Sequence, residues 1–545
     1  MASIHAREVS FSFGPKLVLN SIDLTVAPGQ KVGVVGPNGT GKSTLLRVLA
    51  GDLVPDRGSV ASAPPDAAVG LLPQEPDRRG EESVAEFVAR RTGVAAATAE
   101  LDAATVALSE EVEGADDRYS SALDRWLHLG GPDIEARTGE VLAELGLDGA
   151  VARQATATLS GGQAARVSLA ATLLSRFDVF LLDEPTNDLD FDGLARLEAF
   201  ISQLRAATVV VSHDRAFLER TVTHVLDLVE HDHTGTLYGG GWQAYLADKA
   251  TARRHAEEAF ETYRAQRGEL AARAQSQREW SSKGIGKAKR SGETDKFIRH
   301  RAKASSEKLA SKARATERAA ERLEKVDKPW EGWELRFEIG TAERSGDVVA
   351  ALDGAVVQRG DFRLGPVDLE LGWSERVAIV GPNGAGKTTL LETILGRNEL
   401  VAGSTHLGPG VVVGELGQRR DRFSGDDTAA EVVQGITGLA VNEVRSLLAK
   451  FGLGSEHVLR ASRELSPGER TRANLALFMA EGVNLLVLDE PTNHLDLDAI
   501  EQLEQALERY VGTLLVVTHD RTFLDSVQIG RRLMVESGMV VEASA

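Results

Sequence analysis

Apolar and polar positions predict compact α/β structure in both halves of the chain and a polar helical stretch between them. Near the N-terminus, Val9, Phe11 and Phe13 alternate with serines, which is the pattern of a half-buried strand. The stretch 31–35 predicts a short apolar strand, and 179–182 predicts a buried one. The first leads into a glycine-rich turn and a helical pattern, and the second ends in two carboxylates. The two halves are therefore predicted to be α/β domains.

The second half repeats the first, which is the strongest organisational feature of the chain. A glycine-rich loop at 381–389 follows its first copy by 345 residues, whereas three later motifs follow theirs by 306. The first copy therefore carries an insertion, which we predict to be a helical arm over about 86–135. We place the domains at 1–240, 241–332 and 333–545.

The middle domain is predicted to be a helical hairpin, with helices at about 245–280 and about 300–327. Good helix formers fill both stretches, and a thin apolar seam runs along each. The seam residues are Phe260, Tyr263, Leu270, Ala274, Leu309, Ala313, Ala320 and Leu323. Because a lone helix with so few apolar contacts would be marginal, we expect the two helices to pair antiparallel around a basic turn at 281–304.

Charge is distributed unevenly along the chain. The formal net charge is −19, yet residues 249–328 hold 22 Lys and Arg against 12 Asp and Glu, so the remainder carries −29. A basic segment of this kind favours a polyanionic partner, although a solvated tether between domains has the same composition. The candidate RNA contacts at its tip are Lys283, Lys287, Lys289, Arg290, Lys296, Arg299, Arg301 and Lys303. By contrast, the arm is acidic over 100–124, so any partner it has is expected to be a basic protein surface.

Composition excludes several classes of protein. The chain has no Cys, which rules out disulfides, thiolate zinc sites and Cys-held iron–sulfur clusters. No run of about 20 apolar residues is present, and the N-terminus lacks an apolar signal region. We expect a protein without membrane insertion, located in the cytoplasm.

The glycine-rich loops have the sequence and the strand–loop–helix setting of phosphate-binding loops. Their glycines allow backbone N–H groups to surround phosphate oxygens, Lys42 would neutralise the β and γ phosphates, and the Ser43 hydroxyl would bind Mg²⁺. The predicted ATP-binding residues of the two loops are Gly36, Asn38, Gly39, Gly41, Lys42, Ser43 and Thr44, and Gly381, Asn383, Gly384, Gly386, Lys387, Thr388 and Thr389.

Two adjacent carboxylates end the buried strand of each copy. We predict that Asp183 lies near the metal and that Glu184 polarises the attacking water, the two tasks that nucleotide hydrolysis leaves to side chains. Asp489 and Glu490 are the equivalent pair.

These stretches, with Leu159–Gln163 and Ser212–Asp214, resemble the nucleotide-binding domain of ATP-binding cassette proteins. The resemblance implies that the signature residues Ser160, Gly162 and Gln163 cap ATP bound to the opposite cassette. Ser466, Gly468 and Glu469 would do the same for the first cassette. It also implies that His213 and His519 contact the γ phosphate, that Gln74 and Gln418 sense Mg²⁺ and water, and that Phe13 stacks on adenine. The alternation around Phe13 is equally typical of a core phenylalanine.

Two cassettes that cap each other must face head to tail, and fusion in one chain supplies the partner at high effective concentration. We therefore expect a monomer with intramolecular pairing. Pro467 departs from the signature pattern by removing a backbone donor, although proline suits the first turn of a helix. Gln358 is aligned with Phe13, which puts adenine stacking at the second site in doubt. Both sites keep their Lys, metal ligand and Glu, so both are expected to hydrolyse ATP.

Twin cassettes, no membrane segment and a charged helical linker together resemble the F subfamily of ATP-binding cassette proteins (ABC-F). The resemblance implies binding at the tRNA exit site of the ribosome, with the linker reaching peptidyl-site tRNA, large-subunit rRNA and the peptidyl-transferase centre. A translation factor and an antibiotic-resistance ribosomal protection protein both fit the sequence.

Three alternatives are weighed against this reading. The ATPase subunit of a drug exporter would work with a separate membrane protein, and such cassettes are seldom joined by a basic hairpin. The ribosome-splitting relative carries Cys-bound clusters, which the absence of Cys excludes. An ATP-switched scaffold on DNA would bind nucleic acid through the same basic segment.

Overall fold

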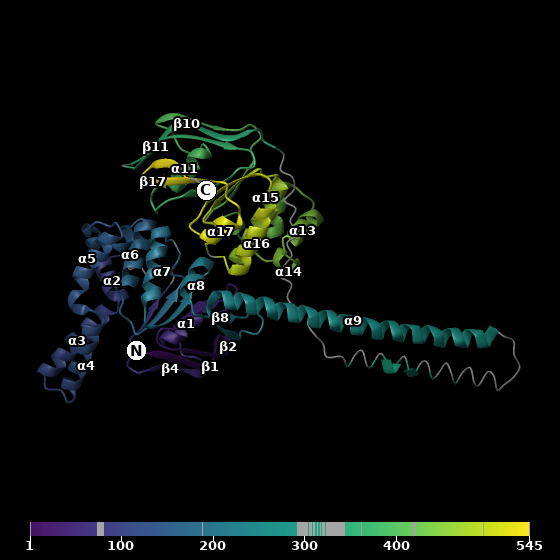
Figure 1. Ribbon diagram of the computed structural model, residues 1–545, viewed down its shortest axis with the longest axis horizontal. Coiled ribbons are helices and arrows are strands. Elements are labelled where there is room, and N and C mark those ends of the chain that lie inside the picture. Colours follow the sequence, from purple (N-terminus) through teal and green to yellow (C-terminus); the bar gives the residue numbers. More distant parts are fainter. Residues whose placement is uncertain are drawn as a thin grey trace. The chain divides into compact units, whose positions relative to one another are not determined.

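The computed structural model describes residues 2–73, 81–187, 189–290, 344–360, 362–417, 421–493 and 495–543, with isolated positions between 304 and 322. The chain forms two compact units. One combines Met1–Gln243 with Leu335–Ala545 and holds both halves of the repeat, and the other is Ala244–Glu334 (Figure 1). We call the two halves of the first unit cassette 1 and cassette 2.

Cassette 1 is built on a six-stranded sheet of order β5-β6-β7-β3-β8-β9, in which β9 alone runs antiparallel to its neighbour. Its strands are β3 (Lys31–Val35), β5 (Val69–Leu72), β6 (Val179–Asp183), β7 (Ala207–Val211), β8 (His224–Leu228) and β9 (Gly235–Gly239). A second, antiparallel sheet of order β2-β1-β4 is formed by β1 (Ser3–Phe13), β2 (Lys16–Val26) and β4 (Arg57–Ala63). Strand β6 is buried along its whole length, as its continuous apolar sequence predicts.

The helices of cassette 1 follow the strands in α/β order, and α1 contributes four leucine and valine side chains to the core between the two sheets. They are α1 (Lys42–Ala50), α2 (Val84–Arg91), α3 (Val94–Ser109), α4 (Ala115–His128), α5 (Ile134–Glu144), α6 (Gly161–Leu174), α7 (Phe191–Gln203) and α8 (Arg215–Thr221). Three short 3-10 helices, Gly131–Asp133, Gly149–Arg153 and Thr156–Thr158, join them.

Cassette 2 has the same strand orders, β14-β15-β16-β12-β17-β18 and β11-β10-β13. The strands are β10 (Val348–Arg359), β11 (Phe362–Gly372), β12 (Arg376–Val380), β13 (Ala402–Leu407), β14 (Val413–Leu416), β15 (Leu485–Asp489), β16 (Thr513–Val517), β17 (Arg531–Glu536) and β18 (Met539–Ala543). The helices are α11 (Lys387–Ile394), α12 (Ala429–Thr437), α13 (Val441–Lys450), α14 (Ser455–Val458), α15 (Pro467–Glu481), α16 (Leu497–Glu508) and α17 (Arg521–Ser526). Short 3-10 helices span Asp421–Phe423 and Ser462–Glu464. The predicted internal repeat is therefore a repeat of the whole fold.

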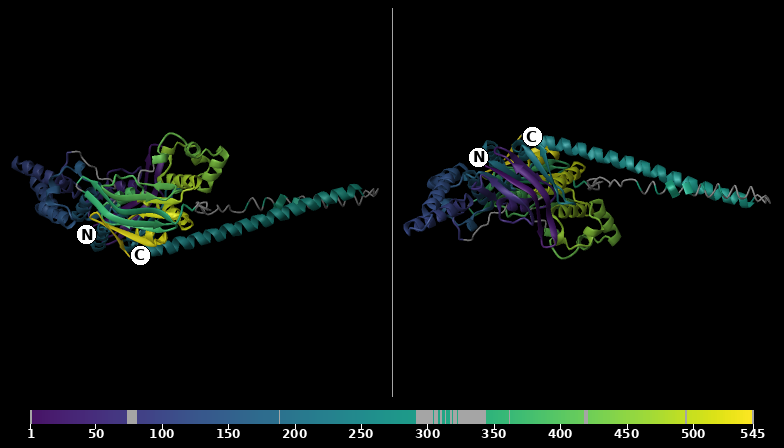
Figure 2. Two further views of the ribbon diagram at one scale, coloured as in Figure 1. Left: turned by 90° about the horizontal axis from the view of Figure 1, so that it is seen from above. Right: turned by 90° about the horizontal axis from the view of Figure 1, so that it is seen from below.

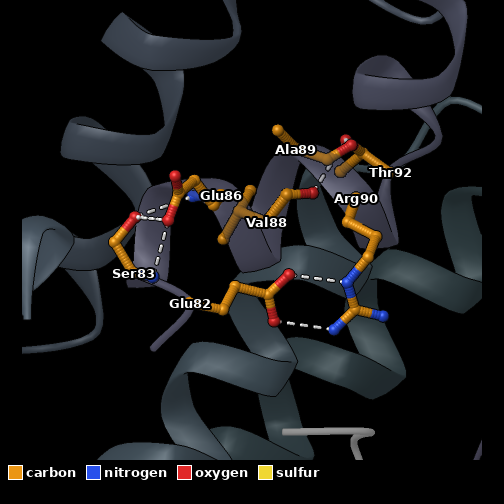
Figure 3. Close-up of polar contacts among 7 residues, drawn as sticks. All are labelled: Glu82, Ser83, Glu86, Val88, Ala89, Arg90 and Thr92. Carbon is orange, nitrogen blue, oxygen red and sulfur yellow. Dashed lines mark hydrogen bonds and ion pairs between the residues drawn. The ribbon is translucent and has the colours of Figure 1, made fainter. Parts of the chain in front are cut away.

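The root of the arm is fixed by the start of α2 (Figure 3). Ser83 caps the helix in a capping box with Glu86, and Arg90 donates two hydrogen bonds to Glu82, at 2.6 and 2.7 Å. An isolated bridge joins Ser83 to Ala155, just before the signature stretch. In cassette 2 the same capping box and bridge occur at Thr428 and Ala461. The extra residues of cassette 1 therefore enter between these two anchored points.

The inserted segment contains an antiparallel pair of helices, α3 and α4, which lie side by side in Figure 1. Trp126 Nε1 donates to Thr98 Oγ1 at 3.0 Å, and Arg118 donates to the Glu100 carboxylate at 2.8 and 3.2 Å. The acidic stretch 100–124 is helical as predicted, except for the turn at 110–114 that separates the two helices.

The linker begins with one long helix, α9 (Gly241–Arg290), which Figure 2 shows as a continuous rod. At about 1.5 Å per residue, its 50 residues extend roughly 75 Å. The expected end near 280 was wrong, because the first ten residues of the predicted turn are helical. Gly284 and Gly286 each cost only about 1 kcal/mol in a helix that contains no proline.

The seam predicted along the first linker helix agrees with its burial. Phe260, Tyr263 and Leu270 are half-buried and Ala274 is buried, while most of their neighbours are exposed. The other seam residues, Leu309, Ala313, Ala320 and Leu323, lie outside the described residues, so the second half of the hairpin stays a prediction.

Candidate functional site

Each glycine-rich loop connects a central strand to the helix that follows it. The loop of cassette 1 joins β3 to α1, and that of cassette 2 joins β12 to α11. The first glycine of each loop has a positive φ, and a Cβ there would lie 2.5 Å from the carbonyl oxygen of Leu228 in cassette 1 and 2.1 Å from that of Val535 in cassette 2. Only glycine fits the close approach of these backbones.

The two loop lysines are buried and fold back over their own loops. Lys42 Nζ donates to Gly36 O at 2.7 Å and to Pro37 O at 3.0 Å, and Lys387 Nζ donates to Gly381 O at 2.8 Å. Burial lowers the pKa of both ammonium groups, while the carboxylates at the strand ends oppose this shift. Each lysine is thus a buried cation held by carbonyl oxygens of its own loop, and such a cation suits a phosphate group.

The carboxylates lie beside these lysines, as predicted. Asp183 ends β6 and accepts a hydrogen bond from Ser43, and burial raises the pKa of its carboxyl group. Within the described part of the chain, Asp183 Oδ1 has no hydrogen-bond partner, and the buried carboxylate of Glu184 contacts only His213. Buried carboxylate oxygens beside a hydroxyl form a donor set that suits Mg²⁺ and a water molecule.

Glu184 is the most strongly perturbed of these acids. Burial, assisted by Asp183 and opposed by Lys42, raises its pKa to about 7. His213 Nε2 lies 3.2 Å from Glu184 Oε1, and burial lowers the pKa of this imidazole to about 3. The equivalent pair in cassette 2, His519 and Glu490, is separated by 3.7 Å. Both glutamates have φ of 47°, a left-handed backbone conformation that is strained for a residue other than glycine.

The signature stretches begin helices, with their serines as N-caps. Ser160 caps α6 in a capping box with Gln163, and Ser466 caps α15 in a capping box with Glu469. Pro467 occupies the first turn of α15, where its missing N–H costs no helical hydrogen bond. The free N–H groups and the positive dipole end of each helix suit an anion.

The first signature meets the phosphate-binding loop of the other cassette. A Cβ on Gly162 would lie 3.0 Å from the Cβ of Asn383. Asn383 N donates to Asp190 Oδ2 at 3.0 Å, and the mirror contact joins Asn38 N to Asp496 Oδ2 at 2.9 Å. The phosphate-binding loop of each cassette is therefore hydrogen-bonded by the other cassette.

A cavity of about 680 Å³ lies at this junction. It is lined by Gly161 and Gly162 from cassette 1 and by Lys387, Thr388 and Glu490 from cassette 2. Its lining further includes Asn383, Gly384, Gly386, Thr389, Asp489, His519, Asp183, Glu184 and His213. Of the residues predicted for the second site, Lys387, Thr388, Asp489, Glu490 and Gly162 line the cavity, whereas Ser160 does not. Of those predicted for the first site, Asp183 and Glu184 line it, whereas Lys42, Ser43, Ser466 and Gly468 do not.

The aromatic candidate Phe13 is half exposed at the end of β1 and stacks edge-on against Phe11, with ring centroids 4.9 Å apart. Its other face is accessible, which a core phenylalanine would not be. In cassette 2, the residue that corresponds to Phe13 is not Gln358 but the residue after it. Phe13 pairs with Lys16 across the β1–β2 turn, and in the corresponding turn Arg359 pairs with Phe362. Arg359 thus takes the position of Phe13, and Phe362 lines the cavity.

Several predicted residues cannot be placed. Gln74 and Gln418 lie outside the described residues, as do Lys296, Arg299, Arg301 and Lys303. The backbone of Lys283, Lys287, Lys289 and Arg290 belongs to α9, but the description does not extend to their side chains.

Sequence reasoning missed the ion pairs between the cassettes. Arg215 donates to Glu504 through both terminal nitrogens, and Arg521 Nη1 lies 3.3 Å from Glu198 Oε1. The available signal was the recurrence of Asp-Arg directly after both histidines. The acidic partners carry no comparable motif.

Comparisons with known proteins agree with this geometry. The family described as ABC transporter matches residues 19–187 and 364–493, which is more than half of the chain. The chain is 37% identical to the tylosin resistance ATP-binding protein TlrC of Streptomyces fradiae, over 99% of this chain and 98% of that protein. It is 33% identical to the energy-dependent translational throttle protein EttA of Mycobacterium tuberculosis (strain ATCC 25618 / H37Rv), over 95% and 89%. The chain belongs to the ABC-F subfamily of ATP-binding cassette proteins.

This ABC-F protein binds ATP in its cassettes and is an ATP hydrolase. Among solved structures, it is similar to the archaeal ribosome recycling factor in its complex with a stalk protein, with a TM-score of 0.59 and 20% identity over 98% of this chain and 89% of that one. That likeness concerns the fold alone. Among the helices of the described residues, none has the length and hydropathy needed to cross a bilayer.

Proposed function

We propose that this ABC-F protein is a ribosome-binding ATPase that acts in the cytoplasm at the tRNA exit site. Its linker then reaches peptidyl-site tRNA, large-subunit rRNA and the peptidyl-transferase centre. The observation that carries the proposal is the composite site, in which Gly162 of one cassette meets Asn383 of the other. ATP bound there would be held by both cassettes, so its binding closes the pair and its hydrolysis releases it.

The chemistry at each site follows from the residues that are present. Lys42 and Lys387 would bind the β and γ phosphates. Mg²⁺ would be held by Ser43 with Asp183 and by Thr388 with Asp489, and would neutralise charge on the phosphates. Gln74 and Gln418 are proposed as further ligands of the two ions. Glu184 and Glu490 accept a hydrogen bond from the attacking water, and His213 and His519 orient the γ phosphate. The signature residues, Ser160 to Gln163 and Ser466 to Glu469, complete the sites from the opposite cassette.

The basic linker supports contact with RNA, and its tip residues are the proposed contacts. The acidic arm, which would be repelled by bare RNA, is proposed to meet a basic ribosomal protein. The names of two relatives, a tylosin resistance protein and a translational throttle protein, support a role as an antibiotic-resistance or translation factor. Both roles require the same closed state on the ribosome.

Co-sedimentation with ribosomes tests the proposal. Glu184→Gln with Glu490→Gln removes the acceptor for the attacking water while keeping the shape of both sites, so ATP should hold the protein closed and bound. We expect the double variant to pellet with ribosomes in ATP but not in ADP. Glu370→Gln changes an exposed glutamate of β11 in the same way and should behave as the wild type. A double variant that stays in the supernatant in ATP would count against ribosome binding, and recovery with a membrane fraction would favour the exporter subunit.

A further inference from the structure

Phe191 of cassette 1 lies against the histidine of the second ATP site. It follows Asp190, whose Oδ2 accepts the hydrogen bond from Asn383 N. The rings of Phe191 and His519 meet edge to face, with centroids 5.2 Å apart and an interplanar angle of 76°. Arg521 Cζ lies 5.5 Å from the centre of the Phe191 ring. One phenylalanine therefore contacts two side chains of the other cassette.

The surroundings of Phe191 are also supplied by cassette 2. Phe191 packs against a small apolar cluster of Ala378, Val380 and Leu524, which belong to β12 and α17. Strand β12 leads directly into the phosphate-binding loop, and α17 begins just after His519. The ring of Phe191 thus fills a recess between the two segments that carry Lys387 and His519.

Among the described residues, the polar contacts of the His519 ring fall on one nitrogen, Nε2, which lies 3.7 Å from Glu490 Oε1. Its Nε2 lies 3.0 Å from Lys387 Nζ, and within the described residues its Nδ1 is buried without a hydrogen-bond partner. Most metal-binding or catalytic histidines are oriented by a hydrogen bond from the second ring nitrogen. Here an aromatic ring from the opposite cassette packs against the imidazole in an edge-to-face pair, and such pairs have a defined geometry.

The first site lacks this arrangement. The residue that corresponds to Phe191 is Leu497, which follows the equivalent cap Asp496. Leucine has no ring to contact His213. The two sites therefore differ at this position, although both have the loop lysine and the pair of carboxylates.

We propose that Phe191 is a positioning residue for ATP hydrolysis at the second site, acting across the cassette junction through His519. When the cassettes separate, Phe191 leaves with cassette 1 and the imidazole loses its aromatic support. Hydrolysis at the second site then depends on the Phe191–His519 contact, which forms only when the cassettes are closed. Hydrolysis at the first site does not depend on such a contact. This inference rests on the proposed contact of His519 with the γ phosphate.

Steady-state ATP hydrolysis by the full-length protein carrying Glu184→Gln tests this inference, because only the second site then keeps its glutamate. Phe191→Leu gives cassette 1 the residue found in cassette 2 and keeps an apolar side chain at this position. In the Glu184→Gln protein we expect it to lower the remaining kcat about fivefold with little change in KM, because orientation of the phosphate is lost while binding by Lys387 remains. Phe191→Tyr keeps the ring and should retain at least half of the kcat of the Glu184→Gln protein.

Two further variants separate the possible causes. Phe200→Leu makes the same change on the same helix, α7, but removes an edge-to-face ring contact with Phe180 of β6, which lies within cassette 1, and should leave kcat unchanged. His519→Ala should lower kcat, and adding Phe191→Leu to it should cause no further loss. If His519→Ala has no effect, the proposed role of His519 fails. If His519→Ala lowers kcat but Phe191→Leu does not, or if the two losses add, only the inference about Phe191 is overturned.

Discussion

At the scale of single residues, the protein keeps many ionisable groups out of water at the cassette junction. Lys42, Glu184 and His213 form one such cluster, and burial is the largest cause of the pKa shift of each. Isolated buried charges are costly, so these groups are kept where a phosphate and a cation would offset them. The buried Asp183 Oδ1, which has no hydrogen-bond partner among the described residues, is consistent with a site built for ligands rather than for stability.

Two buried acids, Asp214 and Asp520, predict that the stability of the protein depends on pH. Burial and the nearby Asp214 carboxylate raise the pKa of Asp520 to about 6, from an ordinary value near 3.8, while Arg215 opposes the shift. The folded state therefore binds this proton more tightly than the unfolded state. The resulting stabilisation is complete below about pH 4 and is lost as the pH rises through 6.

Asp520→Asn should remove this dependence, because the amide oxygen can still accept the hydrogen bond from Phe523 N that caps α17. We expect the variant to be more stable than the wild type by about 1–2 kcal/mol at pH 8 and equal to it near pH 4. Thermal unfolding followed at both pH values measures the difference. A variant that is less stable than the wild type at pH 8 would show that the charge of Asp520 is needed.

At the scale of elements, the sequence predicted the features that depend on short local motifs. The phosphate-binding loops, the strand-end acids and the helix-starting signatures follow from motifs with fixed spacing, and the structure places them at the expected ends of strands and helices. The boundary of α9 was missed because two glycines in a proline-free stretch weaken a helix without ending it. The contacts of Phe191 and Arg215 could not be predicted, because they join residues about 300 positions apart that share no periodic pattern.

The arm is an element whose removal should leave the cassettes intact. Its base packs through Ala97, Leu129 and Trp126 against Phe177, whereas the stretch 100–124 extends beyond that cluster. Replacing 100–124 by a short Gly-Ser link should therefore preserve basal ATP hydrolysis within about twofold. If the arm meets a ribosomal protein, the same deletion in the Glu184→Gln, Glu490→Gln protein should weaken ribosome binding. Unchanged binding in the co-sedimentation assay would show that the arm has no partner there.

At the scale of the whole molecule, the two cassettes are joined by matching contacts on both sides of their junction. Asp190 and Asp496 each bond the other cassette's phosphate-binding loop, and Arg215 and Arg521 each pair with an acid across it. Half-buried ion pairs of this kind specify which surfaces meet more than they stabilise them. Closure would therefore be specific but reversible, as an ATP-driven cycle requires.

Chemical footprinting of ribosomal RNA tests the central claim most directly. The Glu184→Gln, Glu490→Gln protein in ATP should protect nucleotides at the tRNA exit site and at the peptidyl-transferase centre. Adding Lys287→Ala, Lys289→Ala and Arg290→Ala should remove protection at the peptidyl-transferase centre only, since these side chains belong to the linker and not to the cassettes. Absence of any protection by the trapped protein, or full protection without the three basic side chains, would contradict the account.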